Sequence, residues 1–259
     1  MPARIELRRE DALAWVTISN PDRLNALTLE AWRSLGETFR ALDADESVRC
    51  IVVRGAGTRA FAAGADISEF AKTRSTGEQA RAYGEVVTAT LQAMRACQHP
   101  TLAMVYGPCT GGGLEIASAC DIVMSSASAR FGIPIQRLGH VLFYAELKIL
   151  FGLVGRQTCM EMLVAGRLFD ADTAMARGLV ARVVADEELE TETRKVASTI
   201  VAGAPLSARL HKRMLSRLAD SDPLSEEEIA ECWKLCDSAD YRRGIEAFLA
   251  KEKPKFEGD

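Results

Sequence analysis

The first half of the chain alternates short apolar runs with segments whose apolar residues recur every three or four positions. The runs predict buried strands and the periodic segments predict helices with one apolar face. Strands are predicted over 12–19, 50–54, 101–106 and 120–124, and helices over 29–42, 78–97 and 114–119. Strand and helix alternating at this spacing indicate βαβ units, a mainly parallel sheet and an α/β fold.

The second half of the chain changes character. Beyond about residue 140 helices are predicted over 157–165, 170–177, 187–202, 207–217, 223–238 and 240–251, with one short strand over 179–184. No linker or repeat sets this part off. We therefore expect an α/β core over 1–195 and a helical region over 196–259 that packs on the core and on a neighbouring subunit.

Composition narrows the class of protein. With 48% hydrophobic and 26% charged residues in 259, the chain is globular rather than disordered. A net charge of -4 gives no general attraction to nucleic acid or to an anionic membrane. The first residues lack the apolar core of a signal peptide, and no apolar stretch is long enough to span a bilayer. Seven cysteines, most of them in apolar runs, predict free thiols and a cytoplasmic protein. The scattered cysteines and histidines form no metal-ligand motif.

A run of three glycines, Gly111 to Gly113, stands between a predicted strand and a predicted helix. Without a Cβ the turn lets a ligand approach the backbone, and the helix start presents unpaired N–H groups. The segment therefore suits an anion, either a phosphate or a developing oxyanion, although glycine content alone slightly favours tight strand–helix packing. Glu115 follows in the first helical turn. Its negative charge either interacts favourably with the helix dipole, or the side chain acts as a general acid/base with a raised pKa.

A second loop of small residues, 61–68, follows the strand at 50–54 and reads Phe-Ala-Ala-Gly-Ala-Asp-Ile-Ser. Asp66 or Ser68 is suited to cap the next helix. Because both loops follow parallel strands, we expect them to meet at the carboxyl edge of the sheet, where ligands usually bind.

Together these segments resemble the crotonase (enoyl-CoA hydratase/isomerase) superfamily. The resemblance rests on Phe61-Ala-Ala-Gly-Ala-Asp66-Ile, on Gly111-Gly-Gly-Leu-Glu115 and on Cys120-Asp121-Ile. Further matches cover most of the chain, at 20–27, 129–132, 153–155, 174–180 and 247–256. The resemblance implies a ββα superhelix with a C-terminal helical trimerisation region, and hence a homotrimer or a dimer of trimers.

The resemblance also implies the chemistry. The substrate is an acyl thioester of coenzyme A, whose oxygen sits between the N–H groups of Ala65 and Gly112, with Glu115 as a catalytic acid/base. Negative charge on an enolate-like thioester oxygen is thereby stabilised. The coenzyme A contacts carried over by motif are Arg23, Leu24, Ala26, Ala63, Ala65, Asp66, Ile67, Gly111 and Gly112, with Phe248 and Lys251 from a neighbouring subunit. No metal and no tightly bound cofactor are implied.

The chain departs from the family pattern at the second catalytic glutamate. Ile135 stands where that glutamate is expected, and Ala145-Glu146 replaces a glycine pair. His140, Tyr144 and Glu146 are candidates to substitute for it. The favoured interpretation of each is structural: His140 on a loop surface, Tyr144 in the core, and Glu146 in solvent or in an ion pair between subunits.

The sequence leaves three functions open. The first is a lyase resembling enoyl-CoA hydratase, with Glu115 and a substitute partner. The second uses a single base on the same oxyanion hole, as an enoyl-CoA isomerase or an acyl-CoA decarboxylase. The third is an acyl-CoA binding protein with low turnover.

Overall fold

The computed structural model describes residues 3–219 and 222–259 and contains two sheets. The larger has six strands in the order β1-β2-β3-β4-β6-β9. Their bounds are Arg4–Glu10, Leu13–Ser19, Cys50–Gly55, Thr101–Val105, Ile122–Ser126 and Arg182–Val184. Strands β1 and β2 pair antiparallel, and every other neighbouring pair is parallel. The predicted α/β fold with a mainly parallel sheet is confirmed.

A smaller sheet forms beside the first from three short strands in the order β5-β7-β8. These strands span Pro108–Thr110, Arg130–Gly132 and Phe169–Asp170. Because β5 directly precedes the glycine turn, this small sheet fixes where that turn lies. The backbone N–H of Gly111 donates to the carbonyl of Gly132 at the end of β7, which ties the turn down at a second point.

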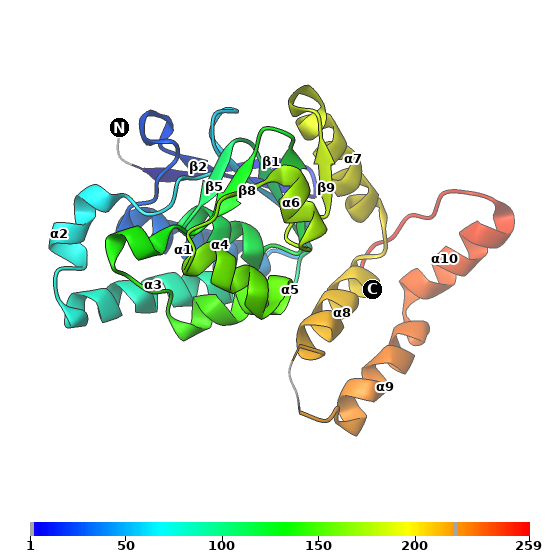
Figure 1. Cartoon of the computed structure of the whole chain (residues 1–259). Coiled ribbons are helices and arrows are strands. Elements are labelled where there is room, and N and C mark those ends of the chain that lie inside the picture. Colours follow the sequence, from blue (N-terminus) through cyan, green and yellow to red (C-terminus); the bar gives the residue numbers. More distant parts are fainter. Residues whose placement is uncertain (1–2, 220–221) are drawn as a thin grey trace.

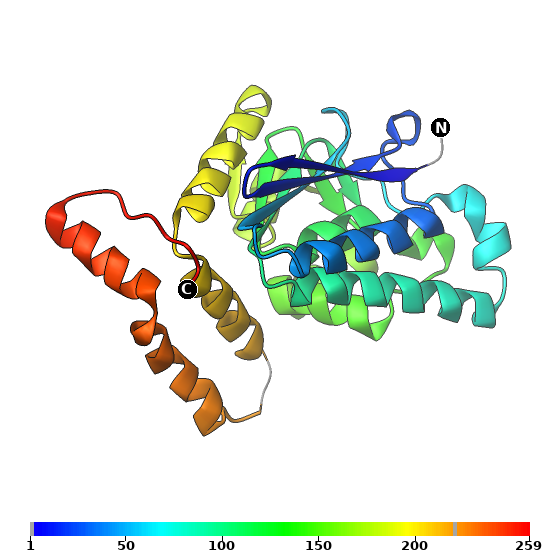
Figure 2. The same ribbon diagram turned by 180° about the vertical axis from the view of Figure 1, so that it is seen from behind.

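Helices cover both faces of the large sheet (Figures 1 and 2). On one face lie α1 (Leu29–Asp43), α3 (Gly77–Ala96) and α4 (Gly112–Ala119), and α7 (Leu189–Ala202) lies on the other. The larger core includes Trp32, Phe39 and Phe61, all buried, and the core under α7 includes Trp15 and Met104. Among the described residues, no helix is both long and apolar enough to cross a membrane.

The C-terminal helices extend away from the sheets (Figure 1). They are α8 (Pro205–Arg217), α9 (Glu226–Lys234) and α10 (Ala239–Ala250). The chain then returns toward α8, and the Arg49 guanidinium donates to the carbonyls of Val201 and Phe256. Helices α9 and α10 leave large apolar side chains in solvent, among them Trp233, Phe248 and Leu249.

The helix before this region differs most from the predicted boundaries. Helix α5 spans Tyr144–Leu163, whereas only 157–165 was predicted. The glycines before residue 157 obscured the pattern, and Gly155 is indeed non-helical, with φ 69°, at a kink inside α5. The remaining helices, α2 (Phe70–Thr73) and α6 (Ala171–Ala176), are short. Strand β1 was not predicted, because charged residues dominate this exposed edge strand.

Candidate active site

The loop after β3 is held between two neighbouring backbones. The N–H groups of Phe61 and Ala62 donate to the carbonyl of Pro108, and Thr110 N–H donates back to Ala62. Further along, the carbonyl of Gly64 accepts from Leu27 N–H. Gly64 takes φ +102°, a conformation that a residue with a Cβ rarely adopts. The loop is thus fixed over the start of α4.

The glycine turn brings α4 against this loop. Gly111 takes φ +52°, and a Cβ on it would lie 3.5 Å from Gly64 Cα. A Cβ on Gly112 would lie 2.7 Å from Cζ2 of the buried Trp32, and one on Gly113 would lie 2.2 Å from the Ala62 carbonyl oxygen. The absence of side chains therefore lets the two loops pack at backbone distance, and the predicted meeting of the loops is confirmed.

Within residues 3–219 and 222–259, two backbone N–H groups have no hydrogen-bond partner where the loops meet. Gly112 is the first residue of α4, so its N–H has no partner within the helix. The bonds beside Ala65 run from Leu27 N–H to Gly64 and from Asp66 N–H to Leu27, which leaves the Ala65 N–H out of the pairing. Both residues, together with Glu115, line one cavity of about 160 Å³.

The carboxyl of Glu115 has an unusual environment. Burial and the neighbouring Glu146 carboxyl together raise the pKa of Glu115 to about 8, while the Arg74 guanidinium opposes that shift. Burial likewise raises the pKa of Glu146, against a hydrogen bond from Phe143 N–H and the charge of Arg74. At neutral pH the pair therefore keeps a proton that separate exposed carboxyls would lose.

The structure corrects the favoured interpretations of the three substitute candidates. Glu146 is only 7% exposed and lies beside Glu115, because α5 packs against α4 and Glu146 lies on the packed side of its first turn. Tyr144 is 91% exposed and does not pack in the core. His140 lies in a loop, as expected, but it is half-buried in the cavity wall, with Nε2 3.0 Å from Arg74 Nη1.

The cavity wall opposite the two loops is largely apolar. Ile135 lines it, so the position that the resemblance gives to a second glutamate offers no proton here. Sequence patterns gave no signal for Arg74, which also lines the cavity and stacks on the ring of Tyr83. It follows the short helix α2 in a polar stretch without a motif, and only the fold brings it to Glu115.

The residues predicted to contact coenzyme A fall into two groups. Ala63, Ile67 and Gly111 line the cavity with Ala65 and Gly112. Beside them, Arg23 Nη1 lies 2.7 Å from Asp66 Oδ1, and Asp66 caps the following turn through Ser68 N–H, as predicted. The Leu24 carbonyl accepts from Ala63 N–H, which places the 20–26 segment, with Ala26, along the same loop.

The second group lies elsewhere. Phe248 and Lys251 stand at the end of α10 and do not line the cavity of Ala65 and Gly112. Phe248 instead borders an apolar groove with Tyr241 and Leu206 of the C-terminal region. The contact of these two residues with coenzyme A from a neighbouring subunit stays a prediction.

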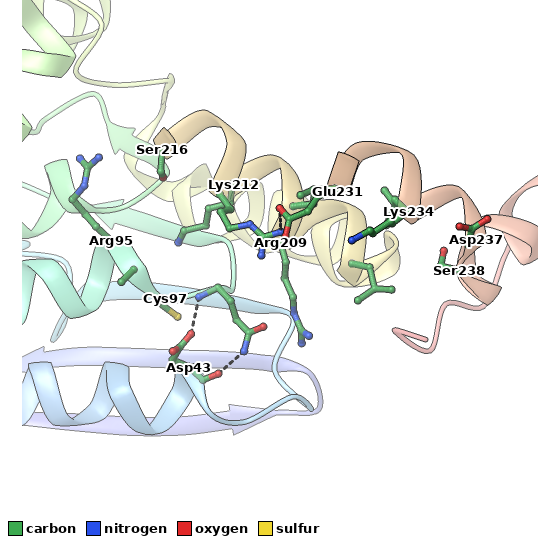
Figure 3. A pocket seen from close by; sticks show the side chains of 16 residues that line it. Asp43, Arg95, Cys97, Arg209, Lys212, Ser216, Glu231, Lys234, Asp237 and Ser238 are labelled. Atoms are coloured by element: carbon green, nitrogen blue, oxygen red, sulfur yellow. Dashed lines mark hydrogen bonds and ion pairs between the residues drawn. The ribbon is translucent and has the colours of Figure 1, made fainter. Parts of the chain in front are cut away.

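A larger cavity of about 850 Å³ opens between the core and the helices α8 and α9 (Figure 3). Two of its basic side chains already have partners: Lys212 Nζ lies 2.8 Å from Asp121 Oδ2, and Arg213 pairs with Glu231. Neither small-residue loop reaches this cavity, and Glu115 does not line it. The smaller cavity is therefore the candidate active site.

The fold and the two apposed loops define an α/β protein of the crotonase type. The family model described as enoyl-CoA hydratase/isomerase matches residues 8–259. The chain therefore belongs to the enoyl-CoA hydratase/isomerase family, and it is an enzyme of that family.

Curated relatives and solved structures agree with this assignment. A short-chain-enoyl-CoA hydratase from Clostridium acetobutylicum is 32% identical over 97% of this chain and 96% of its own. A crotonyl-CoA hydratase from Syntrophomonas wolfei is also 32% identical, covering 97% of each chain. A solved enoyl-CoA hydratase/carnitine racemase from Magnetospirillum magneticum superposes with a TM-score of 0.97, at 47% identity over 98% of this chain and 96% of that one.

Proposed function

We propose that the protein is a lyase that adds water to the double bond of an enoyl thioester of coenzyme A. The observation that carries this proposal is the position of Glu115, a buried acid with a raised pKa, on the cavity that Ala65 and Gly112 also line. A carboxyl whose pKa lies near the working pH, beside two N–H groups that are available to bind an oxygen, is suited to proton transfer coupled to enolate formation.

The reaction needs two proton transfers. A carboxylate takes a proton from water as the water oxygen bonds to the β-carbon, and the π electrons move onto the thioester oxygen. The N–H groups of Ala65 and Gly112 stabilise that oxygen. A protonated carboxyl then delivers its proton to the α-carbon. Glu115 and Glu146 supply one base and one acid, because their mutual repulsion favours a pair that holds a single proton.

Coenzyme A then extends from the cavity along the surface where segment 20–26 lies against the 61–68 loop, with Arg23 beside Asp66. Arg23, Leu24, Ala26, Ala63, Asp66, Ile67 and Gly111 lie along that path and form its binding surface. The closeness of this loop to the Ala65 N–H group supports the assignment. Coenzyme A enters as part of the substrate and leaves with the product.

An assay with three thioesters tests the reaction. We expect hydration of crotonyl-CoA, followed as loss of the conjugated enoyl absorbance. Turnover of a 3-enoyl-CoA alone would replace the hydratase with an isomerase, and release of CO₂ from malonyl-CoA would indicate a decarboxylase. Binding of all three without turnover would leave an acyl-CoA binding protein.

We further infer a homotrimer, or a dimer of trimers, built through the C-terminal helices. Trp233 is 69% exposed, Phe248 82% and Leu249 76%, and apolar side chains gathered on two projecting helices mark an interaction surface. Light scattering should give the mass of three or six chains. A monomer at micromolar concentration would contradict this.

Seven free thiols, five of them buried, support the proposal that the protein works in the reducing cytoplasm.

A further inference from the structure

Arg74 places a positive charge in the wall of the cavity. Its Cζ lies 3.7 Å from the centroid of the Tyr83 ring and 4.5 Å from that of Phe70, so the guanidinium is held between two aromatic rings. It lines the cavity with Glu115 and Ile135. The ring contacts fix the guanidinium, because cations favour aromatic faces.

The guanidinium has donors to spare. Nη1 has His140 Nε2 as its partner, whereas Nε is buried with no hydrogen-bond partner in the described part of the chain. Within residues 3–219 and 222–259, Arg74 forms no ion pair with a carboxylate, unlike Arg23 or Arg177. The Tyr83 hydroxyl in the same cluster is also buried, and its interaction with Arg74 opposes the rise in the pKa of Tyr83 that burial causes. Buried donors without partners are costly unless a ligand satisfies them.

His140 does not add a second charge to the cluster. Burial and the charge of Arg74 lower the pKa of His140, so the ring stays neutral and accepts from Arg74. Among the described residues that line this cavity, Arg74 is therefore the one that carries a positive charge. Glu115 and Glu146 are the nearby acids, but the raised pKa values leave the pair with one shared proton near neutral pH, and neither carboxyl forms an ion pair with Arg74 in the described part of the chain.

We propose that the acyl part of the substrate ends in a carboxylate that binds Arg74. This inference rests on the proposed function and names its substrate class: coenzyme A monothioesters of short unsaturated dicarboxylic acids. A carboxylate matches the planar fork of a guanidinium and can take two parallel hydrogen bonds from it. The cavity of about 160 Å³ limits the chain to a few carbons between the thioester and that carboxylate.

Arg74 has an alternative role, which is to tune the pKa values of the two glutamates, and the two roles predict different effects when Arg74 is replaced. If the guanidinium only lowers the pKa values of Glu115 and Glu146, its loss changes the handling of charged and neutral substrates alike. If it binds a substrate carboxylate, its loss removes the preference for the charged substrate. The ratio of the two affinities separates these roles without any need for turnover.

Calorimetry with two unreactive saturated thioesters tests the proposal. Glutaryl-CoA carries a terminal carboxylate, and 5-methylhexanoyl-CoA has an isopropyl group of the same shape in its place. We expect the wild-type protein to bind glutaryl-CoA tighter by about tenfold or more, because hydrogen bonds to charged groups are the strong ones. Arg74→Gln should bring the ratio close to one, and Arg74→Lys should retain only part of it.

Arg81→Gln is the matched control. Arg81 stands on an exposed part of α3 and pairs with Glu85, so this variant removes the same charge outside the cavity and should keep the wild-type ratio. Equal affinity for both thioesters in the wild-type protein, or an unchanged ratio in a folded Arg74→Gln variant, would overturn the proposal. Failure to hydrate crotonyl-CoA would instead count against the proposed function, since the binding ratio does not depend on it.

Discussion

Glu146→Gln lowers kcat for crotonyl-CoA hydration by roughly 10²–10⁴, the usual contribution of a positioned acid or base. Glu115→Gln gives a loss of the same order, and the double variant is little worse than either single one, because the two carboxyls act as a unit. Glutamine keeps the shape of the side chain, and the hydrogen bond from Phe143 N–H to Glu146 can persist to the amide oxygen. Stopped-flow measurement of kcat checks this result. Glu85→Gln, on the exposed face of α3, is the control.

The pH profile of kcat distinguishes a role of Glu146 in proton transfer from a role in which it only raises the pKa of Glu115. In the wild-type protein the last proton of the pair leaves as pH rises through about 8, so activity should fall on the alkaline side there. Glu146→Gln removes the negative charge beside Glu115, and the pKa of Glu115 then falls toward its ordinary value. The pH profile of the activity that remains in Glu146→Gln should therefore shift to lower pH. A shifted profile with nearly full kcat would show that Glu146 only tunes Glu115 and takes no part in proton transfer.

The fold was largely predictable because its central strands are buried on both sides. Runs such as 50–54 and 101–106 are apolar at nearly every position, and helices such as α1 show one clear apolar face. Strand β1 escaped prediction since it lies at an exposed edge, where packing does not select apolar residues. The division of the chain at residue 195 stays a prediction, although α7 runs across that position.

The candidate site was predictable where small residues or the start of a helix mark it, as at Glu115. Glycines and alanines leave a sequence signal because close approach of two loops requires them, as at Gly64 and Gly112. Arg74 leaves none, and Glu146 was a candidate whose favoured interpretation was structural, because a single charged residue looks the same on a surface as in a pocket. Only the packing of α5 on α4 and the course of the chain after α2 reveal where these side chains lie.

Gly112→Pro is the second substitution for which we expect a large fall in kcat. Proline removes the N–H that the proposed oxyanion hole needs, while the first position of a helix otherwise accepts proline well. Loss of one such donor typically costs about 10²–10³ in kcat. Binding of the saturated butyryl-CoA should weaken less than kcat falls, since a neutral carbonyl gains less from the donor than an enolate oxygen does.

Gly112→Ala provides the matched comparison, because any side chain here meets Trp32. A Cβ at this position would lie 2.7 Å from Trp32 Cζ2, so both variants disturb the ring, yet alanine keeps the N–H. The ratio of kcat between the alanine and proline variants therefore isolates the donor from the steric effect. Equal activity in the two folded variants would remove Gly112 from the oxyanion hole. A proline variant slower than the alanine variant by 10²-fold or more would support a hole that acts on developing charge rather than on ground-state binding.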